Sequence, residues 1–439
     1  MLLALALLTA PAEAGGYYLP DSGIIAYGRG GAYVASAEGQ FAQYYNPAGL
    51  IRTEHPTINL GLSGVQQHTS FTRLADDGTF LDPAVNEAPP FLIPQVGFVT
   101  PLGDDFALAV GFTSPFAPSS DYDPDGPQRY TIIETTIWNF SVGPSLAWRP
   151  VPQVAVGLGL QWQMLRVDQR LKVTTSGQDD HSNDVSVDAR VWDHFTPSFN
   201  AGVIVEPIEE LSIGLSVQPP ARFRGKGEGE LDFTGHVLFE QGMIDKAVWR
   251  DDDITLNIQL PLVLRGGLAG RPVPGLEIEG AVVYERWSAL SDIVVEDIDV
   301  TITGDFVEEQ VEDSISLPAG FRDVVSFRLG AAYEVHPQLA LRAGGFYETA
   351  SLGPQEVNVA VMDTPKIQVG GGLSFWPVPA ARIDLSAAYL FFQDAQVRDS
   401  SLRQINVYGG DEKVVGNGDY SASGWMVGGQ VSWAFGAGS

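Results

Sequence analysis

Six times along the chain, a short turn that contains proline is followed at once by a stretch in which apolar and polar residues alternate. The turns are Pro101-Leu102-Gly103, Pro150-Val151-Pro152, Glu206-Pro207-Ile208, Pro272-Val273-Pro274, His336-Pro337-Gln338 and Pro377-Val378-Pro379. Long acidic stretches that carry glycine and proline separate successive turns. Alternation with a period of two residues indicates β-strands with one apolar face. Short turns at one end and long loops at the other predict an up-and-down antiparallel sheet.

Counting outward from these turns predicts fourteen strands. We place them at 57–71, 91–100, 106–114, 129–148, 154–171, 185–205, 211–235, 254–270, 276–295, 322–335, 339–349, 365–376, 382–393 and 421–435. An even number brings both ends of the sheet to the same side. In a transmembrane β-barrel the short turns then face the periplasm and the long loops face the outside.

The alternation also assigns faces to three stretches. The predicted outward set is Ile254, Leu256, Ile258, Leu260, Leu262 and Leu264 in the first, Leu276, Ile278, Val282 and Tyr284 in the second, and Trp425, Val427, Val431, Trp433 and Phe435 in the last strand. The same alternation turns a set of charged side chains toward the lumen: Arg265, Glu277, Glu279, Arg328, Glu334, Arg342 and Asp384. Opposite charges on neighbouring strands can pair across the wall. A β-sandwich has the same period, but its polar face would meet water and would not need paired charges.

Composition narrows the class further. The 439 residues include no cysteine, which excludes a disulfide-stapled secreted domain and thiolate metal sites. The net charge of −29 argues against a nucleic-acid partner, since phosphate binding needs basic clusters. After the apolar run Leu2 to Leu8, no stretch approaches the ~20 apolar residues that a membrane-spanning helix needs. A membrane protein without such helices must close its backbone hydrogen bonds in a barrel.

The N-terminus reads as two segments that precede the strands. The apolar run ends in Ala12-Glu13-Ala14, which predicts a secretory signal peptide at 1–14, although a basic n-region is missing. Residues 15–56 are rich in small side chains and do not alternate. They are a periplasmic tail or a plug, because a barrel of fourteen strands is wide enough to hold one.

One motif in this second segment carries a family resemblance. Gly28 begins the pattern G-x-G-G-A-Y-V-A, and Asn46-Pro47-Ala48-Gly49-Leu50 follows it. Together with the signal peptide and the fourteen strands, this pattern resembles the FadL family of outer-membrane long-chain fatty-acid and hydrocarbon transporters. The resemblance implies a mostly helical hatch at 15–56 inside a barrel at 57–439. It also implies that Asn46, Pro47 and Ala48 lie beside the ligand route, although Asn-Pro is also a common turn that need not contact ligand.

The resemblance extends to the third strand, which in that family is kinked and opens a lateral gap in the wall. The candidate residues here are Gly111, Phe112, Ser114, Pro115 and Phe116. Proline cannot donate a ladder hydrogen bond and glycine weakens a strand, so disrupted pairing has a physical cause. The alternative is the ordinary end of a strand that enters a loop.

Catalytic and metal chemistry find little support. No H-x-x-x-H, H-E-x-x-H or G-x-S-x-G spacing occurs, so we predict that the protein is not an enzyme. A pair such as His194 and Ser198 is the alternative, although a single histidine in a strand is usually just a polar residue. Asp121, Asp123 and Asp125 imitate the opening of a calcium loop, but Ile132 stands where the bidentate glutamate belongs. The alternatives are a loose calcium site or a solvated acidic loop.

The sequence therefore predicts a monomeric outer-membrane barrel of a Gram-negative bacterium that takes up long-chain fatty acids or other hydrophobic molecules passively, without a cofactor. The acidic loops repel a carboxylate, so either cations neutralise them or the preferred ligand is neutral. Candidate apolar capture residues in the loops are Phe80, Leu81, Phe91, Phe116, Leu238, Phe239 and Met243. For the lumen charges, a structural lattice competes with an anion site at Arg328 or Arg342. A structural or adhesive barrel with cation-binding loops, and a general porin, remain alternatives.

Overall fold

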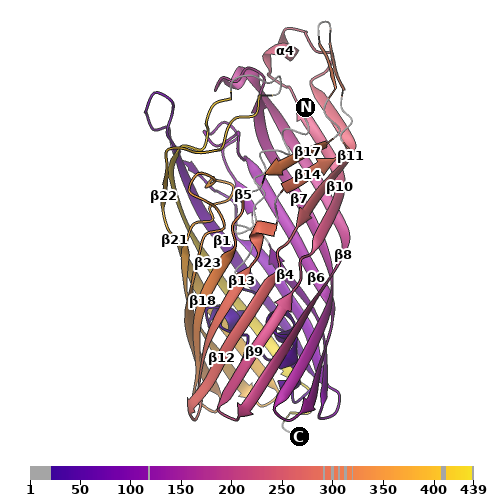
Figure 1. The fold of residues 1–439 in the computed structure, drawn as a ribbon, viewed down its shortest axis with the longest axis vertical. Coiled ribbons are helices and arrows are strands. Elements are labelled where there is room, and N and C mark those ends of the chain that lie inside the picture. Colours follow the sequence, from indigo (N-terminus) through magenta and orange to yellow (C-terminus); the bar gives the residue numbers. More distant parts are fainter. Residues whose placement is uncertain are drawn as a thin grey trace.

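The computed structural model describes residues 21–116, 119–289, 292–297, 301–304, 307–310, 314–318, 320–406 and 412–437. The predicted signal peptide at 1–14 and the first residues of the segment 15–56 lie outside the described residues. The described strands form one closed antiparallel sheet, wrapped into the tall barrel of Figure 1, and a separate hairpin of β15 (Thr301–Gly304) and β16 (Val307–Gln310).

Fourteen strands pair in a ring, as predicted. In ring order they are β1 (Thr57–Arg73), β3 (Phe91–Pro101), β4 (Phe106–Phe116), β6 (Glu134–Val151), β7 (Val154–Thr174), β8 (Asp184–Ile208), β9 (Leu211–Gln218), β12 (Val263–Val273), β13 (Leu276–Glu285), β18 (Val324–His336), β19 (Leu339–Glu348), β20 (Lys366–Val378), β21 (Ala381–Phe392) and β23 (Gly418–Ala434). β23 pairs with β1 from Thr57–Ala434 to Arg73–Gly418 and closes the ring.

Two of the predicted strands are each divided by proline. The predicted strand 211–235 consists of β9 and β10 (Arg222–Asp232), which are separated at Pro219-Pro220. The predicted strand 254–270 consists of β11 (Val248–Gln259) and β12, with Pro261 between them. Proline has no N–H for the ladder, so each strand stops and restarts there. β10 and β11 pair with each other and extend the wall above the ring.

The long loops carry the remaining elements. They are β2 (Ala84–Val85), β5 (Ser119–Asp121), η3 (His181–Asn183), α4 (Val237–Glu240), η4 (Trp287–Ala289), β14 (Asp292–Glu296), β17 (Ser314–Pro318) and β22 (Ala395–Val397). Of these, α4, β5, β14, β17 and β22 are labelled in the upper half of Figure 1. Two predicted strands were too long. The one at 276–295 ends as β13 at Glu285, where η4 begins to turn, and the one at 129–148 begins as β6 only at Glu134, because Arg129 and Tyr130 belong to a buried polar network.

All six proline-marked turns join neighbouring strands at the lower end. Five of them leave only two residues between paired positions, as between Val273 and Leu276. Gly275 in that turn has φ 79°, and Gly103 in the longer first turn has φ 74°, a backbone region that side-chain-bearing residues avoid. The turns predicted from the sequence therefore mark the periplasmic end of the barrel.

In the lower part of the barrel, the predicted faces are confirmed for the last strand and for β13. Val427, Val431 and Trp433 are each about half exposed on the outside, whereas Glu279 on β13 is fully buried on the inside. Exposed aromatic side chains such as Trp148 and Tyr389 join this apolar outer belt. An apolar outer face around an ion-bearing interior is the arrangement of a barrel that spans a bilayer.

The predicted face of the stretch 254–264 is wrong in its upper part. Leu264 is outward and 41% exposed, but Ile254 is fully buried and Leu256 packs against the interior apolar cluster. The irregular residues around Pro261 interrupt the strand, and a slip of one residue moves every following side chain to the other face. Above this break, apolar side chains point inward.

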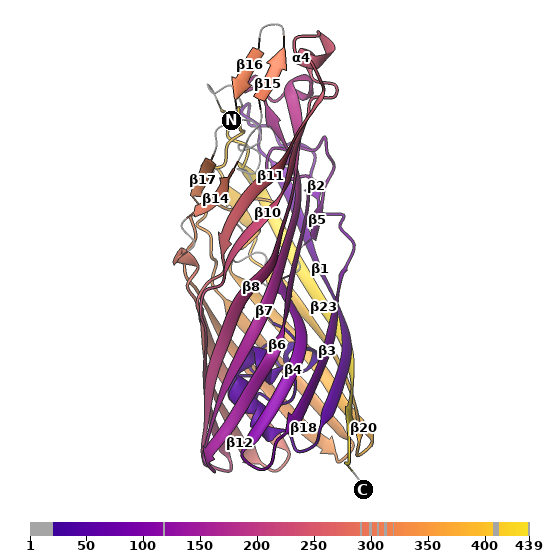
Figure 2. The ribbon, with the colours of Figure 1, turned by 90° about the vertical axis from the view of Figure 1, so that its right-hand side faces the viewer.

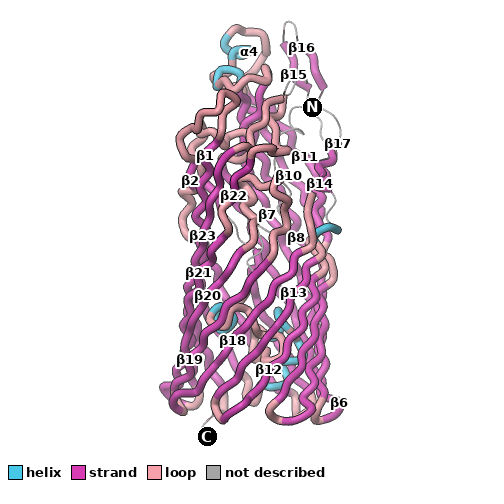
Figure 3. Tube along the Cα trace, turned by 60° about the vertical axis from the view of Figure 1, so that its left-hand side comes forward, coloured by secondary structure: helices cyan, strands magenta, loops and turns pink. Residues whose placement is uncertain are grey.

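The described part of the N-terminal segment, residues 21–56, contains three short helices, α2 (Ile24–Tyr27), α3 (Ala42–Tyr45) and η2 (Pro47–Arg52). These helices make up a minority of the segment, which is otherwise turns and extended chain, so the expectation of a mostly helical segment is wrong for residues 21–56. Figures 2 and 3 show the helices between the strands in the lower half of the ribbon. Among the described residues, no helix has the length and hydropathy to cross a membrane.

Candidate functional site

The Asn46-Pro47-Ala48 motif is buried and caps the helix η2. The Asn46 side-chain oxygen accepts a hydrogen bond from the Ala48 N–H at 3.2 Å. Its amide nitrogen donates to the carbonyl of Val34 at 3.0 Å and to the carbonyl of Val203 on β8 at 3.1 Å. Asn46 therefore joins two parts of the N-terminal segment to the barrel wall, with no solvent exposure.

Two glycines of the wall allow this motif to approach closely. A Cβ at Gly157 on β7 would stand 2.2 Å from the Ala48 nitrogen, and one at Gly202 on β8 would stand 2.1 Å from the Asn46 Oδ1 atom. Real Cβ atoms do not approach backbone so closely, so any side chain at Gly157 would displace the motif. The wall and the segment are thus built to fit each other.

The lumen charges on β13 hold the segment through its backbone. The Glu279 carboxylate accepts hydrogen bonds from the N–H groups of Val34, Ala35 and Ser36 at 2.6, 2.9 and 2.9 Å, and from the Ser36 hydroxyl. Glu277 pairs with Arg29 of the segment at 2.8 Å. A carboxylate that accepts several N–H bonds forms strong, charge-assisted contacts.

The lumen arginines also engage carboxylates. Arg328 on β18 pairs with Asp21 of the segment, and Arg342 on β19 pairs with Asp384 on β21 at 3.3 Å. The guanidinium of Arg265 on β12 lies 4.9 Å from the ring centroid of Tyr44. The predicted inward set therefore lies together around the N-terminal segment. Glu334, although exposed at the periplasmic end, lines a cavity there with Arg29 and Glu277. These contacts favour the structural lattice over an anion site at Arg328 or Arg342.

The wall is irregular where the third strand was expected to be kinked. Pairing between β3 and β4 ends at Val96–Phe112, although β3 continues to Phe91 beside β1. On its other side, β4 loses register with β6 between Thr113 and Phe116, and the buried Ser114 hydroxyl donates to the Asn139 carbonyl at 2.8 Å. Residues 91–95 of β3 thus have no ladder partner on the β4 side within the described chain. The side chains of Pro115 and Phe116 lie outside the described residues.

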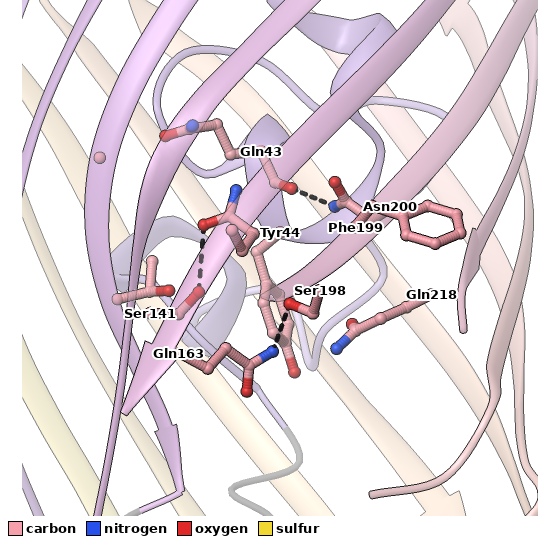
Figure 4. A pocket seen from close by; sticks show the side chains of 11 residues that line it. Gln43, Tyr44, Ser141, Gln163, Ser198, Phe199, Asn200 and Gln218 are labelled. Atoms are coloured by element: carbon pink, nitrogen blue, oxygen red, sulfur yellow. Dashed lines mark hydrogen bonds between the residues drawn. The ribbon is translucent and has the colours of Figure 1, made fainter. Parts of the chain in front are cut away.

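A pocket adjoins this irregular wall, and the sequence analysis missed it. It is a small cavity of about 30 Å³ between the N-terminal segment and the strands β4 and β6 to β9 (Figure 4). Its lining consists of Gln43, Tyr44, Gly111, Thr113, Ser141, Gln161, Gln163, Ser198, Phe199, Asn200 and Gln218. The signal that was available is the run of Gln, Ser and Asn at inward positions of three consecutive strands.

The upper interior is apolar, in contrast to the lower. Buried Leu171, Val187, Leu231 and Ile254 form one cluster there, against which the α4 residues Leu238 and Phe239 pack. A larger cluster runs from the N-terminal segment to the loops; its loop members include Tyr122, Ile132, Phe321, Leu352, Val357, Val361 and Met362. Of the predicted capture residues in the loops, Phe80 is half exposed and Phe91 packs on Trp138.

The structure bears on two further sequence hypotheses, the calcium loop at Asp121 to Asp125 and the pair of His194 and Ser198. Asp125 pairs with Lys172 at 2.9 Å, and no group of three potential metal ligands is found in the part of the chain that the structure describes, Asp121 and Asp123 included. His194 is exposed, whereas Ser198 lines the lumen pocket and accepts a hydrogen bond from Gln163, so the two do not form a catalytic pair.

Two titrating groups lie in the extracellular loops. Burial alone would raise the pKa of Asp179, but Arg73 and Arg129 outweigh burial and lower it. Burial lowers the pKa of His236, whose Nδ1 atom accepts a hydrogen bond from the Leu238 N–H and whose Nε2 atom lies 2.8 Å from the Thr175 hydroxyl. At neutral pH, Asp179 is therefore charged, as its arginine partners require, and His236 is neutral, as the hydrogen bond from Leu238 requires.

A closed antiparallel barrel with an apolar belt outside and ion pairs inside is a protein of the bacterial outer membrane. The chain belongs to the family of outer membrane transport proteins OMPP1/FadL/TodX, whose model matches residues 5–435. It is similar to the long-chain fatty acid transport protein of Escherichia coli O6:H1, with 19% identity over 99% of this chain and 97% of the relative.

Solved structures share the fold. A Pseudomonas aeruginosa FadL homologue superposes with a TM-score of 0.77, at 16% identity, over 96% of this chain and all of that one. The Pseudomonas putida toluene transporter TodX superposes with a TM-score of 0.66, at 16% identity, over 95% of this chain and 99% of that one. The family resemblance seen in the sequence and the location in the outer membrane of a Gram-negative bacterium are confirmed.

Proposed function

We propose that this chain conducts hydrophobic molecules across the outer membrane through a route that the N-terminal segment closes. Its family comprises outer-membrane transport proteins rather than enzymes, and its relatives include a long-chain fatty acid transport protein and a toluene transporter. The observation that carries the proposal is the burial of residues 21–37 and 40–50 against inward-facing side chains below an apolar upper interior. A general porin would keep an open lumen, which these contacts disfavour.

Capture takes place in the upper interior. A hydrophobic molecule crosses the polar surface layer of the outer membrane poorly, and apolar side chains among the loops offer it a dry surface. Binding there follows buried apolar area, at roughly 25 cal/mol per Å² before the costs of ordering. No energy source is needed, because the ligand moves down its own concentration gradient.

Residues 21–56 act as a hatch, and the Asn46-Pro47-Ala48 motif is its anchor. Asn46 bonds both the segment and β8, so a shift of the motif would loosen the segment from the wall. The ligand then leaves sideways between β3 and β4, where pairing ends at Val96–Phe112. The pocket lined by Gln43 and Thr113 connects the segment with that part of the wall.

The hatch is tested by locking it. The chain contains no cysteine, so an introduced pair can form only one disulfide. Ala48 of the segment and Ala155 of β7 pack in one buried cluster, and cysteines at both positions would tie the motif to the wall. Uptake of labelled dodecanoate and dodecane is measured in a Gram-negative host that lacks its own long-chain transporter. We expect oxidised Ala48→Cys/Ala155→Cys to lose at least nine-tenths of uptake and a reductant to restore it.

The two single-cysteine variants are the controls, because they carry the same substitutions without the bond. Uptake that survives in the fully oxidised pair, at equal membrane levels, would contradict a moving hatch. If the unmodified chain takes up neither probe faster than cells without the chain do, transport itself is contradicted.

The lateral exit is tested by a disulfide that joins β3 to β4 across the unpaired part of the wall. Gln95 and Thr113 would be the next pair if the β3–β4 ladder continued past Val96–Phe112. We expect a disulfide in Gln95→Cys/Thr113→Cys to reduce uptake about tenfold. Val99→Cys/Ala109→Cys is the matched control, since these residues already pair on the same two strands. Equal uptake in both oxidised variants would show that the ligand leaves by another way.

A further inference from the structure

The pocket of Figure 4 is lined entirely by uncharged side chains, in a barrel whose interior is otherwise rich in ions. Eight of its residues carry an amide or an aliphatic hydroxyl: Gln43, Thr113, Ser141, Gln161, Gln163, Ser198, Asn200 and Gln218. Tyr44 adds aromatic surface, whereas the Phe199 ring points outward and is 47% exposed. A few convergent polar groups beside apolar surface are typical of a site that orients a largely apolar ligand.

Part of this polar lining is satisfied internally. Gln163 donates to the Ser198 hydroxyl at 2.6 Å, and Ser141 donates to the Gln161 side-chain oxygen at 3.0 Å. The Asn200 amide nitrogen donates to the backbone carbonyl of Gln43, as the dashed line in Figure 4 marks. These bonds fix the orientation of the remaining polar atoms before any ligand arrives.

Two lining side chains are left to bond a ligand. The Thr113 hydroxyl on β4 and the Gln218 amide, half-buried at the end of β9, make no hydrogen bond within the described chain. An amide offers an accepting oxygen and a donating nitrogen, and a hydroxyl can do both. A ligand that both donates and accepts would therefore satisfy them. The Asn200 Oδ1 atom, which also lacks a partner among the described residues, is buried against Gly159 of the wall.

We propose that this pocket binds the hydroxyl end of an uncharged hydrophobic molecule, such as a long-chain alcohol or a phenol. The inference rests on the proposed transport function and names the ligand chemistry of the route. A hydroxyl can donate to the oxygen of the Gln218 amide and accept from the Thr113 hydroxyl. An alkane does neither. A carboxylate has no proton to donate and would leave the Gln218 oxygen without a donor.

The interior charge balance excludes a carboxylate on independent grounds. Buried carboxylates outnumber buried cations nine to seven among the described residues. Six of the seven cations, Arg29, Arg73, Arg129, Arg328, Arg342 and Lys366, form ion pairs with carboxylates. The seventh, Arg265, stacks over Tyr44 and is attracted by the buried Glu285. An incoming carboxylate would therefore have to displace a resident one.

The test compares three probes of equal chain length, 1-dodecanol, dodecanoate and n-dodecane, in the transporter-deficient host at pH 7.5. We expect the chain to reach half-maximal uptake at a concentration about tenfold lower for dodecanol than for the other two. Gln218→Leu keeps the shape and removes the polar group, so half-saturation for dodecanol should rise about tenfold, the effect of one lost hydrogen bond, while dodecane is unaffected. The control Gln338→Leu changes an exposed periplasmic turn and should alter nothing.

A gain-of-function variant completes the test. Gln218→Lys supplies the missing cation, and uptake of dodecanoate should improve relative to dodecanol. Equal half-saturation for dodecanoate and dodecanol in the unmodified chain, or no response of dodecanol to Gln218→Leu, would overturn the proposed pocket while leaving transport intact. Uptake of no probe above that of cells without the chain would instead overturn the proposed function.

Discussion

The lower and upper halves of β7 follow opposite rules within one uninterrupted strand. In the lower half the outward residues are Leu158, Leu160 and Trp162, about half exposed, opposite the inward Gln161 and Gln163. In the upper half the outward residues Arg166, Asp168, Arg170 and Lys172 form ion pairs, opposite the buried Leu171 and Val173. The solvent outside the wall changes from lipid to water, and the strand exchanges the chemistry of its two faces accordingly.

This comparison teaches that alternation alone does not say which face is inside. The lower half needs lipid outside and can hold polar groups within. The upper half is built like a soluble barrel around an apolar core. The boundary is marked by aromatic side chains, with Trp162 packed near Phe195. Such residues are typical of the membrane interface.

The largest expected change in stability comes from exchanging the outward residues of the two halves, with a charge in the lipid-facing half and an apolar side chain in the water-facing half. Leu158→Arg puts a charge midway between the periplasmic end of β7 and the boundary at Trp162, and should lower the free energy of unfolding by about 2–4 kcal/mol. Arg170→Leu, on the same face of the same strand, removes an exposed ion pair and should cost about 1 kcal/mol or less. Urea unfolding in lipid vesicles measures both. Equal costs would show that the two halves do not differ as described.

A smaller effect, on the docking of the N-terminal segment, is expected when one carboxylate of each half is replaced by an amide. Glu279→Gln leaves three backbone N–H groups facing an amide and should weaken the docking of the N-terminal segment by about 1.5–3 kcal/mol. Glu228→Gln removes an exposed partner of Arg190 and should have no effect on the segment. Hydrogen exchange at Val34 to Ser36 reports the difference. Unchanged exchange in Glu279→Gln would mean that other contacts hold the segment.

The smallest effect is a pH dependence confined to the upper half. Burial lowers the pKa of His236 below its usual 6.5, so the neutral form is favoured in the folded loop. Its contribution to stability is complete above about pH 6.5 and is lost as the pH falls through the folded-state pKa. Protonation would also remove the acceptor for the Leu238 N–H. Exchange at Leu238 should therefore quicken from pH 7.5 to 5, and His236→Gln should abolish this dependence.

The sequence predicted those parts of the fold that repeat. Six proline turns and the alternating stretches located all fourteen strands, because each turn and strand obeys a local rule. The faces around Ile254 were assigned the wrong way round because the irregular stretch at Pro261 shifts the alternation by one residue, so that the side chains above it exchange their inward and outward positions. In β7 the exchange was visible in the sequence, as the even positions change from Leu160 to Arg170 without a break.

The candidate site was predicted only in part, since its pieces come from distant parts of the chain. Asn46 was named from the motif, but its bond to Val203 depends on the tertiary fold. The inward charges were found by alternation, whereas their partners Asp21 and Arg29 lie in a segment without periodicity. The uncharged pocket escaped notice because single glutamines and serines on separate strands carry no pattern until the strands lie side by side.

The seam between β1 and β23 implies an order of assembly. The N-terminal segment directly precedes β1, and its anchors lie all around the ring, from β1 and β3 beside the seam to β8, β13 and β18 across from it. A finished ring would leave no side entrance for a folded segment, so we expect the seam to form last, around a segment already in place. Leu60 and Val431 face each other across the seam. The time at which a disulfide forms in Leu60→Cys/Val431→Cys during assembly would therefore report when the seam closes. The same contacts that close the route would then also decide when the barrel is complete.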